Sequence, residues 1–313
     1  MTHDLPSPAR PLKIGTRGSP LALAQAHETR ARLMAAFDLP ETAFVIEVIK
    51  TSGDRIQDRP LKEVGGKGLF TKEIEEALLT EGIDIAVHSM KDMPVEQPAG
   101  LALDTFLPRE DVRDAFVSLA HGGLDDLPEG AVVGTSSLRR RAQLLNRRPD
   151  LRLVEFRGNV QTRMRKLADG VAEATFLAMA GLNRLGMDVP ACAISPDDML
   201  PAVAQGAIGI EHREADRATG HMLAAIHHLE TGQRLAAERA FLAALDGSCQ
   251  TPIAGLAELD GGTLTLRGEI LRTDGSEALA DSISGPIEDG AELGKTLARD
   301  LLARAGEGFF DWR

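Results

Sequence analysis

Ile83-Asp84-Ile85-Ala86-Val87-His88-Ser89-Met90-Lys91-Asp92-Met93-Pro94 is the stretch that decides the fold class and locates the candidate site. Residues 83–87 form an apolar run typical of a buried strand, and the sequence then turns abruptly polar. Ligands of α/β proteins bind at the carboxyl ends of such strands. Asp92, with Lys91 and His88 beside it, is therefore a candidate acid–base group. An ordinary polar turn that closes a strand would have the same composition.

The composition is that of a globular protein with more than one domain. The chain has 313 residues, of which 43% are hydrophobic, enough for two or three domains with cores of their own. Helical and strand-like patterns alternate, which favours the α/β class. No apolar run approaches the ~20 residues of a membrane span, and residues 1–11 lack the build of a signal peptide. Two cysteines, Cys192 and Cys249, make no disulfide framework, which favours a cytoplasmic setting.

The charge is unevenly distributed. The net charge is -12, yet residues 134–166 contain ten basic side chains and only two acidic ones. A local basic surface on an acidic protein indicates a confined anionic ligand rather than general affinity for a polyanion.

Two short motifs repeat one another. Gly15–Ser19 and Gly134–Ser137 both follow an apolar strand, contain Gly-Thr and end in a serine that would cap the next helix. The N-terminus of a helix favours anions, and Arg17 adds a charge in the first motif. We expect two similar α/β units facing one cleft. A capped turn with a solvent-facing arginine is the alternative.

More arginines follow predicted strands in the basic segment. Arg157 and Arg163 come after the strand at 151–156, and Arg184 comes after the strand at 174–179. Strand ends meet at one edge of a sheet, where guanidinium groups can bind carboxylates through paired hydrogen bonds. A solvated basic helix is the alternative.

Two loops are candidates for chemistry. Residues 51–68 form a long polar loop, and the glycine-rich run 65–70 that ends it holds Lys67, which suggests a mobile lid or a plain flexible loop. Cys249 lies in a turn-rich loop where an accessible thiol would serve chemistry, unless it is incidental. Cys192 is expected to be a small core residue. No metal site is predicted.

These motifs together resemble the porphobilinogen deaminase family, also called hydroxymethylbilane synthases, over nearly the whole chain, about 12–305. The quoted motifs are Gly15–Ala22, Val64–Phe70, His88–Asp92, Gly134–Arg140, Phe156–Val160, and Cys249 with Pro252-Ile253.

The resemblance implies a fold, a cofactor and a reaction. It implies two similar domains of the type II periplasmic-binding-protein kind flanking a cleft, plus a small C-terminal α+β domain. The expected domains are 11–106 with 207–225, 107–206, and 226–313. A dipyrromethane cofactor would be attached to Cys249 by a thioether. Four porphobilinogen molecules would be condensed head to tail with loss of ammonia, and hydroxymethylbilane would be released by hydrolysis.

The resemblance also implies the roles of single residues. Asp92 would be catalytic, and Gln25, Lys67, Phe70 and Ser89 would contact the substrate or form the lid. The cofactor-binding residues would be Arg17, Ser19, Lys91, Ser137, Arg139, Arg140, Arg157, Arg163, Arg184 and, covalently, Cys249. The chain departs from the family's pattern at Glu63, where Lys62 lies one place earlier, and at Ser248, where a glycine is frequent. A cytoplasmic monomer that binds neither nucleic acid nor membrane is expected.

Two rival functions explain part of the sequence. A non-catalytic anion-binding protein would use the arginines but not Cys249. A nucleic-acid-binding protein would use the basic segment, but aromatic residues make up 4% of the chain and tyrosine is absent, whereas proteins that bind single strands commonly stack bases on aromatic rings.

Overall fold

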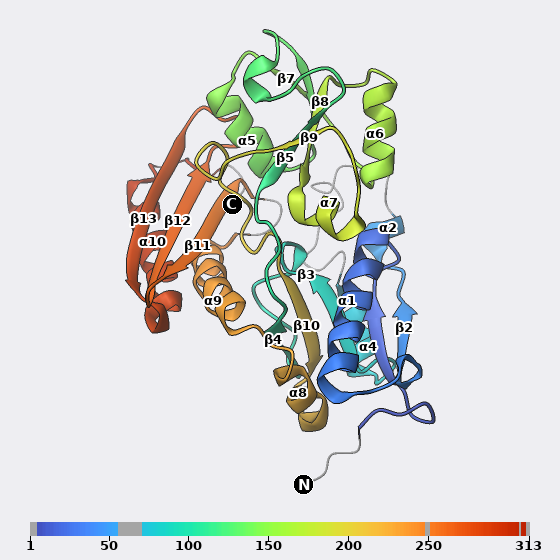
Figure 1. The fold of residues 1–313 in the computed structure, drawn as a ribbon. Helices are drawn as coiled ribbons and strands as arrows, with labels where there is room; N and C mark the ends of the chain where they lie inside the picture. The colour runs from blue at the N-terminus through green and yellow to red at the C-terminus, as the bar shows by residue number, and fades with distance from the viewer. Residues whose placement is uncertain (1–4, 56–70, 248–250, 307, 311–313) are drawn as a thin grey trace. The chain divides into compact units, whose positions relative to one another are not determined.

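The computed structural model describes residues 5–55, 71–247, 251–306 and 308–310, and its elements are labelled in Figure 1. Contacts divide the chain into two compact units, residues 1–110 with 207–232, and residues 111–206 with 233–313. Each unit is described by itself.

The first unit is built on a five-stranded sheet of order β2-β1-β3-β10-β4. Strands β2, β1 and β3 are parallel, whereas β10 runs antiparallel to both β3 and β4. Ile14, Ile85 and Ile208 lie in its core, together with Leu33 of helix α1. The strands are β1 (Leu12–Thr16), β2 (Phe44–Val48), β3 (Ile85–Ser89), β4 (Leu101–Phe106) and β10 (Ile208–Arg213), and the helices are α1 (Pro20–Phe37), α2 (Ser52–Arg55), α4 (Lys72–Leu79) and α8 (Arg217–Ala224).

The second unit contains a sheet with the same plan, of order β7-β6-β8-β5-β9. Here β7, β6 and β8 are parallel, and β5 runs antiparallel to both β8 and β9. Phe116 and Phe176 pack edge to face in the core at 6.3 Å between ring centroids. The strands are β5 (Asp114–Ser118), β6 (Val132–Gly134), β7 (Arg152–Val154), β8 (Ala174–Ala178) and β9 (Ala191–Ala193), and the helices are α5 (Leu138–Arg147), α6 (Val160–Ala168) and α7 (Met179–Leu185).

The two sheets confirm the predicted α/β class with two similar halves. In each sheet one strand runs antiparallel to the other four, β10 in the first unit and β5 in the second. Each of these strands is the first one after the chain enters its unit, at residue 207 for β10 and at residue 111 for β5. Both predicted caps are present, because Ser19 accepts a hydrogen bond from the N–H of Ala22 and Ser137 accepts one from the N–H of Arg140.

The C-terminal part is a small α+β structure, as predicted. Three antiparallel strands follow one another in order. Gly261 and Gly262 join the first two with φ of 51° and 89°, as a Gly-Gly pair between two strand-like runs predicts for a tight two-residue hairpin turn. The elements are α9 (Leu229–Ala244), β11 (Ile253–Asp260), β12 (Thr263–Leu271), β13 (Ala278–Pro286) and α10 (Gly290–Arg304). The proposed domain limits, including a third domain from residue 226, stay a prediction.

Two local expectations were wrong. The apolar run 204–211 predicts a strand, but strand β10 begins only at Ile208, since Ala204 and Gly206 have φ of 61° and 86°, which no extended strand accepts. Cys192 is exposed on strand β9 and is not a core residue. No helix among the described residues is long and apolar enough to cross a membrane.

Candidate active site

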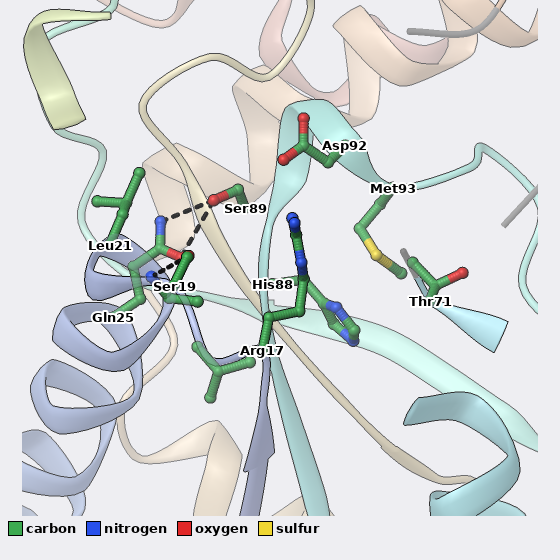
Figure 2. A pocket seen from close by; sticks show the side chains of 11 residues that line it. Arg17, Ser19, Leu21, Gln25, Thr71, His88, Ser89, Asp92 and Met93 are labelled. Carbon is green, nitrogen blue, oxygen red and sulfur yellow. Dashed lines mark hydrogen bonds between the residues drawn. The ribbon is translucent and has the colours of Figure 1, made fainter. Parts of the chain in front are cut away.

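A pocket lies at the carboxyl ends of β1 and β3, within the first unit (Figure 2). Five of the predicted site residues meet in it: Arg17, Ser19, Gln25, Ser89 and Asp92. Its remaining lining residues are Leu21, Ala22, Thr71, Val87, His88 and Met93. The expectation that polar groups gather at these strand ends is therefore confirmed for this half of the chain.

The turn after β1 holds Arg17 at the pocket. The side chain of Thr16 donates a hydrogen bond to the carbonyl of Ala22 at 3.2 Å, and Ser19 caps helix α1. Gly15 is required by close packing, because a Cβ there would overlap the side chain of Ile83. In Figure 2 the guanidinium end of Arg17 and the carboxylate of Asp92 face the same space.

A single turn of 3-10 helix, η2 (Met90–Asp92), carries the candidate acid. The N–H of Met90 donates to the carbonyl of Ala207 at 3.0 Å, and the Met90 side chain is 1% exposed. Because this buried side chain and this hydrogen bond fix the turn, Lys91 and Asp92 stay half-buried at its outer side. Asp92 lines the pocket, whereas Lys91 does not.

Gln25 and Ser89 form a buried polar contact across the pocket wall. The Gln25 amide nitrogen donates to the Ser89 hydroxyl at 2.9 Å, and that hydroxyl lies 3.1 Å from the Gln25 amide oxygen. By contrast, the carboxylate of Asp92 has no hydrogen bond or ion pair to any residue that the structure describes. The Asp92 carboxylate can therefore bind or exchange a proton with a ligand without first breaking an internal contact.

The second unit brings three of the predicted arginines together near a buried acid. Asp114, fully buried, lies 2.8 Å from Arg139 and accepts a hydrogen bond of 2.7 Å from Arg140. Arg140 and Arg163 both donate to the carbonyl of Phe176, at 3.0 and 3.1 Å. Burial, together with the neighbouring charge of Arg140, lowers the pKa of Arg163 to about 10.

Asp114 stays charged despite its burial. Burial alone would raise the pKa of Asp114, but the charges of Arg139 and Arg140 outweigh that effect and bring the pKa well below its usual range. Gln205 adds a hydrogen bond of 2.9 Å to the same carboxylate. Two guanidinium groups contact this carboxylate, and Arg163 adds a third nearby through the carbonyl that it shares with Arg140. Glu269 also interacts with Arg139, so three arginines are set against two acids, an excess of positive charge that suits an anionic ligand.

The remaining predicted residues divide into two groups. Ser137 caps α5, Arg157 is half-buried, and Arg184 donates to the carbonyl of Gly206 at 3.0 Å. Lys67, Phe70 and Cys249 lie outside the described residues, as do Glu63 and Ser248.

Sequence reasoning missed Asp114, whose one signal is an acid at the first position of an apolar strand. Among the described residues no cluster of metal ligands was found.

A carboxylate and a guanidinium in one pocket, on an α/β fold with a second arginine cluster, define a candidate site for an anionic ligand. The chain belongs to the porphobilinogen deaminase family. Residues 12–221 match the model of the porphobilinogen deaminase dipyromethane cofactor binding domain, and residues 233–303 match that of the C-terminal domain.

Similar proteins cover nearly the whole chain. Porphobilinogen deaminase of Paracoccus denitrificans is 67% identical over 99% of both chains. The chloroplastic porphobilinogen deaminase of Pisum sativum is 55% identical over 96% of this chain and 83% of its own length. Among solved structures, a probable amino-acid ABC transporter extracellular-binding protein of Bacillus subtilis is 12% identical, with a TM-score of 0.41 over 72% of this chain and 96% of its own.

Proposed function

We propose that this protein is a porphobilinogen deaminase, which condenses four porphobilinogen molecules head to tail with loss of ammonia and releases hydroxymethylbilane by hydrolysis. The observation that carries the proposal is the pocket of the first unit, in which Asp92 and Arg17 stand together at two strand ends, in a chain 67% identical to a porphobilinogen deaminase over its full length.

Arginines suit the substrate because each pyrrole ring carries an acetate and a propionate. Arg17 in the first unit, and Arg139, Arg140 and Arg163 in the second, would bind these carboxylates through charge-assisted hydrogen bonds. Arg157, Arg184, Lys91, Ser19 and Ser137 are proposed for the same task. Each contact with a charged group contributes about 1.5–3 kcal/mol, so several are needed to hold a long chain of rings.

Asp92 is the proposed acid–base group. The protonated aminomethyl group leaves as ammonia when its carbon–nitrogen bond breaks, and the substrate carbon that remains is electron-poor. A carboxylate fixed beside the ring can pass a proton and stabilise positive charge on the pyrrole N–H. The absence of an internal partner for Asp92 among the described residues agrees with this task.

The cofactor is proposed to be dipyrromethane, attached to Cys249. When bound, it supplies the pyrrole carbon to which the first substrate is joined. The arginine cluster near Asp114 fits a group with several carboxylates, because its three arginines outnumber the two acids that interact with them, Asp114 and Glu269. A thiolate at Cys249 would be the attacking group in the attachment, and Lys67 and Phe70 would cover the site.

Intact-protein mass spectrometry tests the cofactor, and an assay of porphobilinogen consumption tests the activity. We expect ~420 Da of extra mass from two attached pyrrole units, absent in Cys249→Ala. A chain of unmodified mass that binds carboxylates without turnover would instead support a non-catalytic anion-binding protein. Salt-sensitive retention on DNA would support nucleic-acid binding.

We further propose a monomer that works in the cytoplasm. The exposed, unpaired thiol of Cys192 suits a reducing compartment. The domain division 11–106 with 207–225, 107–206 and 226–313 is proposed alongside, and limited proteolysis that releases a fragment beginning near 226 would support its last limit.

A further inference from the structure

A buried acid lies beneath the pocket. Glu211 of strand β10 is fully buried, and its Oε2 lies 3.1 Å from Nε2 of His88. His88 is itself 6% exposed, belongs to strand β3 and lines the pocket together with Asp92. The two strands are hydrogen-bonded neighbours, so the pair forms part of the rigid sheet under the site.

Packing alone does not explain this acid. Burying a carboxylate costs several kcal/mol even when it is paired, and its Oε1 has no hydrogen-bond partner among the residues that the structure describes. The same strand places Ile208 and Ile210 in the core, so an apolar residue would fill the position at no such cost. Buried ionisable groups beside a pocket are candidates for function.

A second acid interacts with this pair. Burial raises the pKa of Glu75 on helix α4, and the charge of Glu211 raises it further, while a hydrogen bond with Thr71 and the charge of His88 lower it. Thr71 itself lines the pocket, so Glu75 is linked to the pocket through that side chain. Arg17 and Asp92 are the charged groups that line the pocket itself.

The contact with Glu211 favours one tautomer of His88. A carboxylate oxygen accepts hydrogen bonds, so the matching tautomer is the one in which Nε2 donates. In the neutral ring Nδ1 then has a free lone pair and acts as an acceptor. Within the described parts of the chain Nδ1 has no hydrogen-bond partner. An acid that fixes a histidine tautomer in this way is a known positioning device.

We propose that His88 is a substrate-contact residue and that Glu211 is its positioning residue: Nδ1 of His88 accepts a hydrogen bond from the protonated aminomethyl group of porphobilinogen, next to Asp92. This inference rests on the proposed function. The carboxyl group of Glu211 beneath the ring favours a cation over a neutral N–H, and the substrate has one cationic group. His88 takes no proton in this scheme; it orients the carbon–nitrogen bond that breaks.

Two substitutions of His88 separate contact from structure. His88→Gln places an amide N–H near the position of Nε2 and keeps the bond to Glu211, but removes Nδ1. His88→Asn places an amide oxygen near the position of Nδ1 but loses the hydrogen bond to Glu211. We expect kcat/KM for porphobilinogen to fall about tenfold to a hundredfold in His88→Gln, the factor that one hydrogen bond to a charged group supplies. His88→Asn should be less stable yet more active than His88→Gln.

His212→Gln is the matched control. His212 lies on β10, is also 6% exposed and also pairs with an acid, Asp104 at 3.4 Å, but it does not line the pocket. The kcat/KM of His212→Gln should stay within about twofold of that of the unsubstituted chain. Thermal unfolding and the attached mass are measured for every variant, so that a change in activity is compared only between folded proteins with cofactor.

The outcomes are distinguishable. The inference is overturned if kcat/KM of His88→Gln lies within threefold of that of the unsubstituted chain. It is also overturned if kcat/KM falls across the variants in the same order as their thermal stability. Both outcomes leave the proposed function intact. If the unsubstituted chain does not consume porphobilinogen, the proposed function itself fails. If His88→Gln does not fold, Glu211→Met decides: it removes the acid at similar volume, and a stable variant with unchanged kcat/KM refutes the positioning role.

Discussion

Replacing Asp114 by asparagine should lower the free energy of unfolding more than the same replacement of an exposed acid. Asp114 is fully buried and lies within 2.8 Å of Arg139 and 2.7 Å of Arg140. Asparagine would keep an acceptor oxygen but would leave two buried guanidinium groups without a counter-charge. Removing one partner of a buried pair costs about 3–5 kcal/mol, and we expect the lower part of that range because one hydrogen bond can persist.

Urea unfolding followed by circular dichroism measures this change in the free energy of unfolding. Asp198→Asn is the control, since Asp198 forms an ion pair with Arg147 of 2.7 Å but is 51% exposed; its loss should be below about 1 kcal/mol. Asp114→Asn combined with Arg140→Met should recover part of the loss, because the unpaired charge is then removed as well. Equal losses for Asp114→Asn and Asp198→Asn would refute the reasoning.

The same contacts predict a pH dependence. The folded pKa of Asp114 lies below the ordinary value of 3.8 because of the two arginines, which outweigh burial. Its stabilising contribution is therefore fully present above that value and is lost as the pH falls through the depressed folded pKa. The stability difference between the unsubstituted chain and Asp114→Asn should stay constant from pH 7 to about 5 and shrink below about 4. A difference that grows on acidification would contradict this assignment.

Three further substitutions test the site and its scaffold. Asp92→Asn should nearly abolish turnover and keep the attached mass, so near-normal consumption of porphobilinogen would remove Asp92 from the mechanism. Gly134→Ala should lower stability by about 1–3 kcal/mol because the new methyl group meets the Phe156 ring, whereas Gly306→Ala, with open space around it, should not; equal melting temperatures would show that the ring can yield. Ser19→Ala should cost about 1 kcal/mol through the lost cap of α1, and an unchanged unfolding midpoint would argue against that cap.

Local patterns predicted much of the fold. The apolar run 83–87 predicts a strand, and strand β3 is present but begins at Ile85 and continues through His88 to Ser89. The serines at 19 and 137 are helix caps, as predicted. These features depend on residues close together in sequence, where periodicity and capping chemistry act directly.

The parts that could not be predicted depend on contacts between distant residues. Asp114 and Arg140 are 26 positions apart, and His88 and Glu211 are 123 apart. No spacing rule links such pairs before the sheets are assembled. Likewise, β10 begins only at Ile208 because Ala204 and Gly206 have left-handed backbone. An apolar sequence pattern gives no sign that an alanine adopts this conformation.

The position of β10 has a consequence for biosynthesis. This strand lies between β3 and β4, and the residue just before it binds the turn that carries Asp92. A nascent chain on the ribosome that has reached residue 206 therefore has all the pocket-lining residues but lacks the interior strand that pairs with β3. The first unit can be completed only after residues 111–206 of the second unit have been synthesised.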